Sequence, residues 1–329
     1  MRRLTFIVLA LAALYGSYWF IGATALAKGI DAQISAMQAD GWTVQTTDLT
    51  TEGFPSRFDT SASDITLGTP DRGLIWRVPF AQANALSYRP NEVILVLPEH
   101  QEIEIDGKTY EVQSDGLKAS ATVAANTALD LTSFTAQSGP LAVDGATGEL
   151  VSLSNGIVAL RPSGPAPLTY DVYANLDGLT LSAGLRRLLD PTSALPETFA
   201  QSTIDGTVTL SAPLDRHALT AAEVPQIDGF KINAMTLTWG KLSLRASGEI
   251  AIDSAGLPTG KLTLSAQNWS QVLDMAVQAE IIDQTVVRTV KNMAKLMAGG
   301  STDLSVPVSF QNGMMSLGPI PAGPAPRFR

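Results

Sequence analysis

Four carboxylates that could carry acid–base chemistry lie close together in the sequence: Asp48, Glu52, Asp59 and Asp64. A pair of such acids can serve as general acid and as nucleophile or base in glycoside hydrolysis. The distance between the two carboxyl groups decides that chemistry, and sequence spacing does not give it. A solvated strand edge accounts for the same residues, so both interpretations stay open.

Other signatures of catalysis or metal binding are missing from the sequence. The two histidines, His100 and His217, are far apart and have no histidine partner at a metal-ligand spacing. The absence of cysteine excludes disulfides, thiol nucleophiles and thiolate metal sites. There is no phosphate-binding loop, dinucleotide fingerprint or nucleophile elbow. We expect no catalytic residue, no metal site and no cofactor, and therefore a protein that is not an enzyme.

The composition is that of a globular, β-rich protein. The chain has 329 residues, 45% of them hydrophobic and 16% charged, and this length suits one large or two ordinary domains. Small hydroxyl residues take the place of charged ones, as expected where many strand faces meet water. The net charge of −9 argues against the basic surface that nucleic-acid binding requires, so we expect no nucleic-acid partner.

The amino terminus predicts a membrane anchor. Residues 4–27 contain no charge, and about 20 apolar residues suffice for a helix to cross a bilayer. Arg2 and Arg3 precede this run and place the amino terminus in the cytoplasm, with residues 28–329 exported. We predict a transmembrane signal anchor over 1–27 and a juxtamembrane helix within 28–41. A cleaved signal peptide is the alternative, because Ala25-Leu26-Ala27 fits a cleavage site.

The rest of the chain is dominated by strand patterns. Polar and apolar residues alternate from Lys241 to Asp253, and Lys261 to Gln267 resumes the alternation as the return strand of a hairpin. Asp106-Gly107 and Asn312-Gly313 are typical of tight hairpin turns. The predicted fold is mainly β, an elongated curved antiparallel sheet that forms either a groove or a sandwich. Its expected parts are an amino-terminal β region (42–161), a carboxyl-terminal β region (168–318) and a Pro-rich tail (319–329), with a Pro-rich boundary at 162–167.

One long amphipathic helix is expected over 270–298. Apolar residues recur along one side of it, among them Met275, Ile282, Val286 and Met293. This stripe predicts either a lid over an apolar groove or a helix at a membrane surface. A helix that simply packs on its own sheet would show the same stripe.

The segment Gly53–Phe58 predicts a kink between two edge strands, because it contains both a glycine and a proline. Phe54, Pro55, Arg57 and Phe58 are candidate contacts for a lipid or a protein partner. The guanidinium of Arg57 could bind an acidic partner or a lipid phosphate. A structural ion pair is the other use that we expect for it.

Several segments resemble the bacterial family called domain of unknown function 2125. They are Gly41-Trp42, Gly53–Phe58 and Leu86–Asn91, together with the amino-terminal apolar run. More distantly, Gly240–Leu264 and Asn312–Pro319 are similar to the carboxyl-terminal part of AsmA-like envelope proteins. That similarity implies one amino-terminal anchor, a long curved β-sheet, and a link to outer-membrane assembly and phospholipid movement.

The expected function is that of a non-enzymatic protein anchored in the bacterial inner membrane, with its bulk in the periplasm. It would hold a lipid or an apolar segment in a groove of the sheet and serve envelope maintenance. A sheet with one apolar face must cover that face with another layer, and few helices are predicted to do so. The alternatives are a scaffold that recruits envelope proteins through sheet edges near residues 54–58, and a hydrolase of envelope glycan or lipid.

Overall fold

A computed structural model describes residues 2–164, 168–191, 193, 195–218, 224–278 and 287–328. The chain divides into two compact units. Unit 1 comprises residues 1–139, 143–148 and 215–224, and unit 2 comprises residues 140–142, 149–214 and 225–329. Each unit is built on antiparallel strands, which confirms the mainly β fold class.

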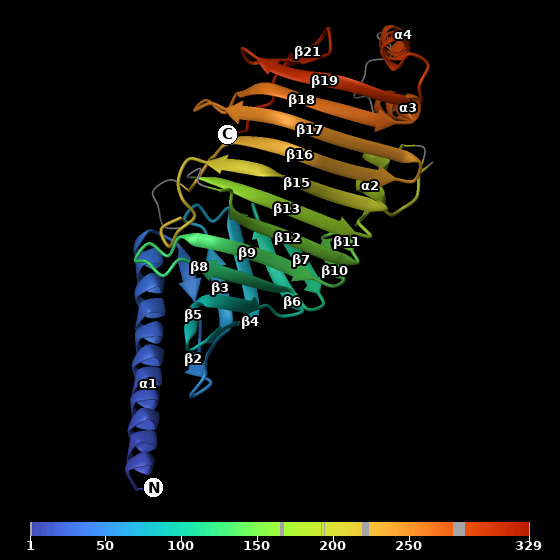
Figure 1. Cartoon of the computed structure of the whole chain (residues 1–329). Coiled ribbons are helices and arrows are strands. Elements are labelled where there is room, and N and C mark those ends of the chain that lie inside the picture. The colour runs from blue at the N-terminus through green and yellow to red at the C-terminus, as the bar shows by residue number, and fades with distance from the viewer. Residues whose placement is uncertain are drawn as a thin grey trace. The chain divides into compact units, whose positions relative to one another are not determined.

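Helix α1 (Arg2–Ala39) opens unit 1 as one continuous element of 38 residues (Figure 1). It is long and apolar enough to cross a membrane, as the sequence predicted. The expected juxtamembrane helix is the last third of the same helix. Asp40 and Gly41 end it with a turn, and Gly41 has a positive φ of 88°. Trp19 is the one side chain that the described part of α1 buries.

The sheet of unit 1 is organised around its two longest strands, β3 and β4, which pair along most of their length. On its other side, β4 pairs with β6 through its first residues and with β5 through its last. The predicted Asp106-Gly107 hairpin joins β6 to β7. The strands are β1 (Thr43–Gln45), β2 (Leu49–Glu52), β3 (Arg57–Gly68), β4 (Leu74–Leu86), β5 (Arg89–Val96), β6 (His100–Ile105), β7 (Lys108–Ser114), β8 (Lys118–Val123) and β9 (Leu131–Ser138).

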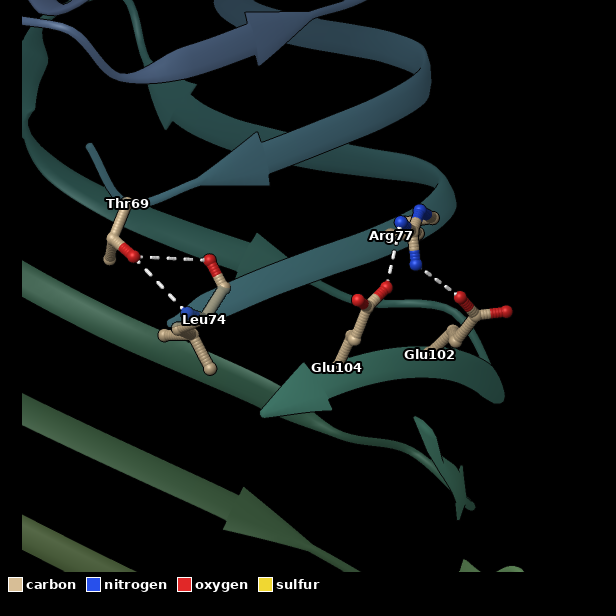
Figure 2. A network of polar contacts seen from close by, with 5 residues as sticks. All are labelled: Thr69, Leu74, Arg77, Glu102 and Glu104. Carbon is tan, nitrogen blue, oxygen red and sulfur yellow. Dashed lines mark hydrogen bonds and ion pairs between the residues drawn. The ribbon is translucent and has the colours of Figure 1, made fainter. Parts of the chain in front are cut away.

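Polar contacts hold the first half of β4 in place (Figure 2). Arg77 forms ion pairs with Glu102, at 2.5 Å, and with Glu104, at 3.0 Å, so that one guanidinium bridges two carboxylates of β6. Those carboxylates raise the pKa of Arg77 above its usual value. In the turn before β4, the hydroxyl of Thr69 accepts the backbone N–H of Leu74 at 3.1 Å. The contacts fix where the β3–β4 connection ends.

Unit 2 is an antiparallel meander in which β12, β13, β15, β16, β17, β18, β19, β20 and β21 pair in that order. β10 (Leu141–Gly145) has residues in both units. The other strands are β11 (Gly148–Leu153), β12 (Asn155–Pro162), β13 (Thr169–Asp177), β14 (Thr180–Leu181), β15 (Gln201–Leu210), β16 (Ile227–Trp239), β17 (Leu242–Ile252), β18 (Pro258–Gln267), β19 (Asp303–Gln311), β20 (Met314–Leu317) and β21 (Ile320–Pro324), with helix α2 (Ala183–Leu189) after β14.

The central hairpin of β17 and β18 forms as predicted. Leu244 lies opposite Ala266, and Ala246 lies opposite Leu264, without a shift along β17 and β18. Because side chains alternate between the two faces of a strand, these residues share one apolar face. The hairpin of β19 and β20 around Asn312-Gly313 is confirmed as well.

The single helix expected over 270–298 is replaced by two helices, α3 (Trp269–Gln278) and α4 (Val287–Ala298). Residues 279–286 lie outside the described residues. Lys291 of α4 forms a 2.5 Å ion pair with Asp274 of α3. A straight helix would place these residues about 25 Å apart, so the ion pair requires that the two helices lie side by side.

Strand pairing involves both sides of the Pro-rich stretch at 162–167 and also the tail. The strands on either side of the Pro-rich stretch at 162–167, β12 and β13, pair with each other inside unit 2. Residues 165–167 lie outside the described residues. The tail contains a strand, because β21 pairs with β20.

Candidate apolar groove

Unit 2 contains an apolar groove with a volume of about 520 Å³. Its floor is the apolar face of β16 to β20, and α3 and α4 form its other wall. The lining residues are Met235, Leu237, Leu244, Arg245, Ala246, Leu264, Ser265, Ala266, Trp269, Leu273, Met293, Ala294, Met297, Leu304, Val306 and Leu317. The volume falls within the range typical of small-molecule sites.

The groove lies between two packed clusters on the same strands. At one end of β17, Leu242 packs with Trp239, Phe199 and Leu195. At the other end, Ile250 and Ile252 pack with residues of β19 and with Ala325 near the carboxyl terminus. Leu244 and Ala246 lie between these clusters and line the groove. The apolar face of β17 is therefore covered at both ends and hollow in the middle.

The side chains of the groove are accessible although they are apolar. Five of them keep 37–43% of their surface exposed: Met235, Leu244, Leu264, Met297 and Leu317. By contrast, Ile250 on the same face of β17 is 1% exposed. Clustered apolar side chains on a soluble surface typically mark a binding site.

The lining contains two polar residues, Arg245 and Ser265, which are cross-strand partners. Both alternate with the apolar residues of their strands, so their side chains project from the opposite face. The hydroxyl of Ser265 donates to that of Ser305 on this opposite face, at 3.1 Å. The groove therefore offers dispersion contacts and burial of apolar surface rather than ionic recognition.

Of the four residues predicted along the helical stripe, Met293 lines the groove from α4. Met275 belongs to α3, whose bounds are described although this side chain is not. Ile282 and Val286 lie outside the described residues. The sequence pattern did not indicate that Met297, Leu304 and Leu317 would join Met293. These three residues are apolar and follow a strand or helix spacing, which was the only indication in the sequence. The same pattern is expected for a groove and for a packed core.

The four residues predicted near the kink lie in unit 1, in a loop that contacts α1. The ring of Phe58 packs on Trp19, with ring centroids 5.9 Å apart, and Phe54 meets Trp19 edge to face at 5.5 Å. The Phe54–Pro55 peptide bond is cis, and Pro55 is exposed. Arg57 forms an ion pair with Asp59. A structural ion pair was one of the two uses expected for this residue.

Glycines allow this loop and α1 to approach each other. A Cβ added at Gly22 would lie 2.8 Å from the ring of Phe58, and one added at Gly16 would lie 3.7 Å from the ring of Phe54. Gly53 has a φ of 98°, and a Cβ there would lie 2.9 Å from the backbone oxygen of Arg57. The loop thus needs glycine both within itself and on the helix that it covers.

The acids near the kink are held by contacts within the sheet of unit 1. Glu52 and Asp59 are cross-strand partners on β2 and β3, and Asp59 accepts hydrogen bonds from Arg57. Asp64 accepts from the hydroxyl of Thr47 at 3.0 Å. Across the described part of the chain, no group of three or more His, Asp or Glu residues could hold a metal ion.

Comparison with known proteins gives one match. The family model described as an uncharacterized protein conserved in bacteria (DUF2125) matches residues 19–326. The chain belongs to this family. No curated protein and no solved structure matches it. The match to DUF2125 spans the loop at 53–58 and all the residues of the groove, whereas the more distant similarity to AsmA-like proteins stays an expectation.

Proposed function

We propose that this DUF2125 protein is a non-enzymatic, membrane-anchored protein that holds the acyl chain of a lipid in the groove of unit 2. The observation that carries the proposal is the row of half-exposed apolar side chains between two packed clusters. In water, such a surface is unfavourable by about 25 cal/mol for each Å². A flexible, unbranched apolar ligand would cover this surface without needing a polar partner.

The wall formed by α3 and α4 suits a ligand of variable length. Met293 and Met297 project into the groove from α4, and methionine adapts its shape to different apolar partners. The ion pair between Asp274 and Lys291 lies between two partly exposed side chains, so it links the helices only weakly. α3 and α4 would therefore adjust relative to each other, while the floor is held by strand pairing.

The apolar helix α1 supports a function at a membrane. Arg2 and Arg3 before the apolar half of α1 favour a cytoplasmic amino terminus, by the positive-inside rule. Residues 28–329 would then lie on the periplasmic side of the membrane, where a protein with an acyl-chain groove could serve envelope maintenance.

The alternatives have less support. A scaffold that uses the sheet edge near residues 54–58 would need those residues free, but Phe58 is buried against Trp19. A hydrolase would need two acids facing a common site, and Asp59 is engaged by Arg57 while Asp64 accepts from Thr47.

A photo-crosslinkable fatty acid tests the proposal. The full-length protein is expressed in bacteria that incorporate the probe into their phospholipids, irradiated, purified and digested, and the adducts are located by mass spectrometry. We expect adducts on groove residues such as Leu264 and Met297, as well as on α1, which contacts bilayer lipid. Leu264→Trp fills the groove and should remove the groove adducts while leaving those on α1.

The matched control is Ser247→Trp. Ser247 is exposed and alternates with Ala246, so the new ring lies on the polar face of β17, outside the groove. This variant should keep the groove adducts. Adducts confined to α1 in the unmodified protein would rule out acyl-chain binding by the groove.

A further inference from the structure

α1 contacts the sheet of unit 1 through residues in its apolar half. This is the half that would span the hydrocarbon core of the membrane. Tyr15, Tyr18 and Trp19 all bond to the loops at Gly53–Phe58 and Leu86–Arg89, which we name the tip. The tip is the end of the sheet where β2 and β4 finish, and β2 lies beside the middle of α1 (Figure 1).

The depth of the tip in the membrane can be derived from Arg3 and Lys28, the two charged residues at the ends of the apolar run. Arg3 and Lys28 are separated by about 37 Å of continuous helix, and neither charge enters the core readily. The core is about 30 Å thick, so its far boundary is at least that distance from Arg3. Trp19 lies about 24 Å from Arg3, and Gly16 about 20 Å. Trp19 is therefore at least about 6 Å below the far boundary, and Gly16 about 10 Å.

Four side chains at this depth have paired polar groups, as a hydrocarbon environment requires: Tyr15, Tyr18, Trp19 and Ser87. Oδ1 of Asp59, by contrast, is buried without a hydrogen-bond partner. The hydroxyl of Tyr18 donates to the backbone oxygen of Ser87 at 2.6 Å, and the indole N–H of Trp19 donates to that of Arg57 at 2.6 Å. The hydroxyl of Ser87 lies 3.0 Å from that of Tyr15 and 3.2 Å from the backbone oxygen of Pro55, to which it donates. Ser87 is fully buried.

The outward side of the tip carries three exposed apolar side chains and two exposed arginines, Arg57 and Arg89, which pair with Asp59 and Glu92. Phe54 is 55% exposed, Tyr88 63% and Leu86 37%, and Phe20 of α1 is exposed beside Phe54, with stacked rings 5.5 Å apart. The charged residue of the 53–58 loop, Arg57, is neutralised by Asp59, and its long side chain can reach the headgroups. Paired polar groups inside and aromatic side chains outside are the arrangement of a protein surface that meets lipid.

We propose that the tip of unit 1 inserts into the hydrocarbon of the leaflet farther from Arg3, with Phe54, Leu86 and Tyr88 as the lipid-facing residues. The partner is the bilayer itself, and the inserted tip adds a second attachment to that of α1. This inference does not depend on the acyl-chain groove, which belongs to unit 2.

Depth-dependent quenching tests the insertion. The protein has no cysteine, so single cysteines at Phe54, Leu86 or Tyr88 can each carry an environment-sensitive fluorophore. The full chain is reconstituted in vesicles of phosphatidylethanolamine and phosphatidylglycerol, without other proteins. We expect a blue-shifted emission at all three positions and loss of most of the fluorescence with a quencher on the acyl chain near the carbonyl.

Ile105→Cys is the matched control. Ile105 is also an apolar residue, and 45% of its surface is exposed. It pairs with Leu74 at the start of β4, and a strand of this length places Leu74 about 40 Å from Leu86 at the other end. The same fluorophore there should be unaffected by quenchers within the bilayer. Equal quenching at Tyr88 and Ile105 would overturn the insertion. So would quenching at the tip by headgroup quenchers alone, because it would place the tip on the membrane surface.

Discussion

The indole N–H of Trp19 donates a 2.6 Å hydrogen bond to the backbone carbonyl oxygen of Arg57. One partner belongs to the apolar half of α1 and the other begins β3, so this bond ties the membrane anchor to the sheet of unit 1. The aromatic rings of Phe54 and Phe58 surround it. α1 is therefore packed against the sheet as well as being an anchor, and its orientation relative to the sheet of unit 1 is set by side-chain contacts.

Replacing Trp19 with Phe should destabilise unit 1. The ring is largely kept, but the carbonyl oxygen of Arg57 loses its donor, and an unsatisfied buried acceptor costs about 1–3 kcal/mol. The midpoint of denaturant unfolding, followed by circular dichroism of the full chain in detergent, measures the loss. Ile21→Ala is the control, since Ile21 is 71% exposed on the same helix. An unchanged midpoint for Trp19→Phe would mean that the bond contributes nothing.

Gly22→Leu should separate α1 from the 53–58 loop. Even a Cβ at this position would lie 2.8 Å from the ring of Phe58, so a larger side chain must displace that ring. Overpacking of this kind typically costs about 1–3 kcal/mol. Faster proteolysis of the 53–58 loop in the detergent-solubilised protein would report the separation.

Gly29 provides the matched control for that change. It belongs to the same helix, and nothing lies within 4 Å of a Cβ added there. Gly29→Leu gains the same helix propensity without a clash, and its loop should be cleaved as slowly as in the unmodified protein. Equal cleavage of both variants would show that the close approach at Gly22 is not needed.

The turn before β4 should respond to acid through Asp71. The hydroxyl of Thr69, and then the backbone N–H of Gly73, donate to its carboxylate and lower the pKa of Asp71 below the usual 3.8. A lowered pKa in the folded state stabilises the turn above pH 3.8, and this stabilisation is lost as the pH falls through the folded pKa.

An NMR titration of the Asp71 carboxyl carbon measures this shift directly. The midpoint should lie below 3.8 in the unmodified protein and rise toward that value in Thr69→Val. Thr109→Val, an exposed threonine in β7, should leave the titration unchanged. A midpoint at or above 3.8 in the unmodified protein would contradict the role of the Thr69 hydroxyl.

The sequence predicts the central hairpin well because its signal is local. Alternation between Lys241 and Asp253 follows directly from backbone geometry, and it predicts that Leu244 and Ala246 share one face. The hollow between the two ends of β17 depends on where α3 and α4 lie. That position is a tertiary property, and apolar residues such as Leu264 look the same in a packed core and in a groove.

The contact between α1 and the tip was missed for a related reason. Tyr15, Tyr18 and Trp19 each carry a hydroxyl or N–H group within an apolar run. Such groups in a membrane segment need hydrogen-bond partners. Their partners, Ser87 and the backbone of Arg57, are 38 to 72 positions away. A search for interior hydrogen-bond donors in the anchor would have predicted a contact, though not its location.

The last prediction concerns the two helices that wall the groove. Asp274 and Lys291 form an ion pair at 2.5 Å, so cysteines at these two positions should be joined by a short bismaleimide. The unmodified chain has no cysteine, and the cross-link can be read as a linked peptide by mass spectrometry. Asp274→Cys with Leu296→Cys is the control, because Leu296 is 83% exposed on another side of α4. In one straight helix residues 274 and 291 would be about 25 Å apart, beyond the reagent. Failure of the 274–291 pair to cross-link would favour a continuous helix over 270–298 and would remove the wall that closes the groove.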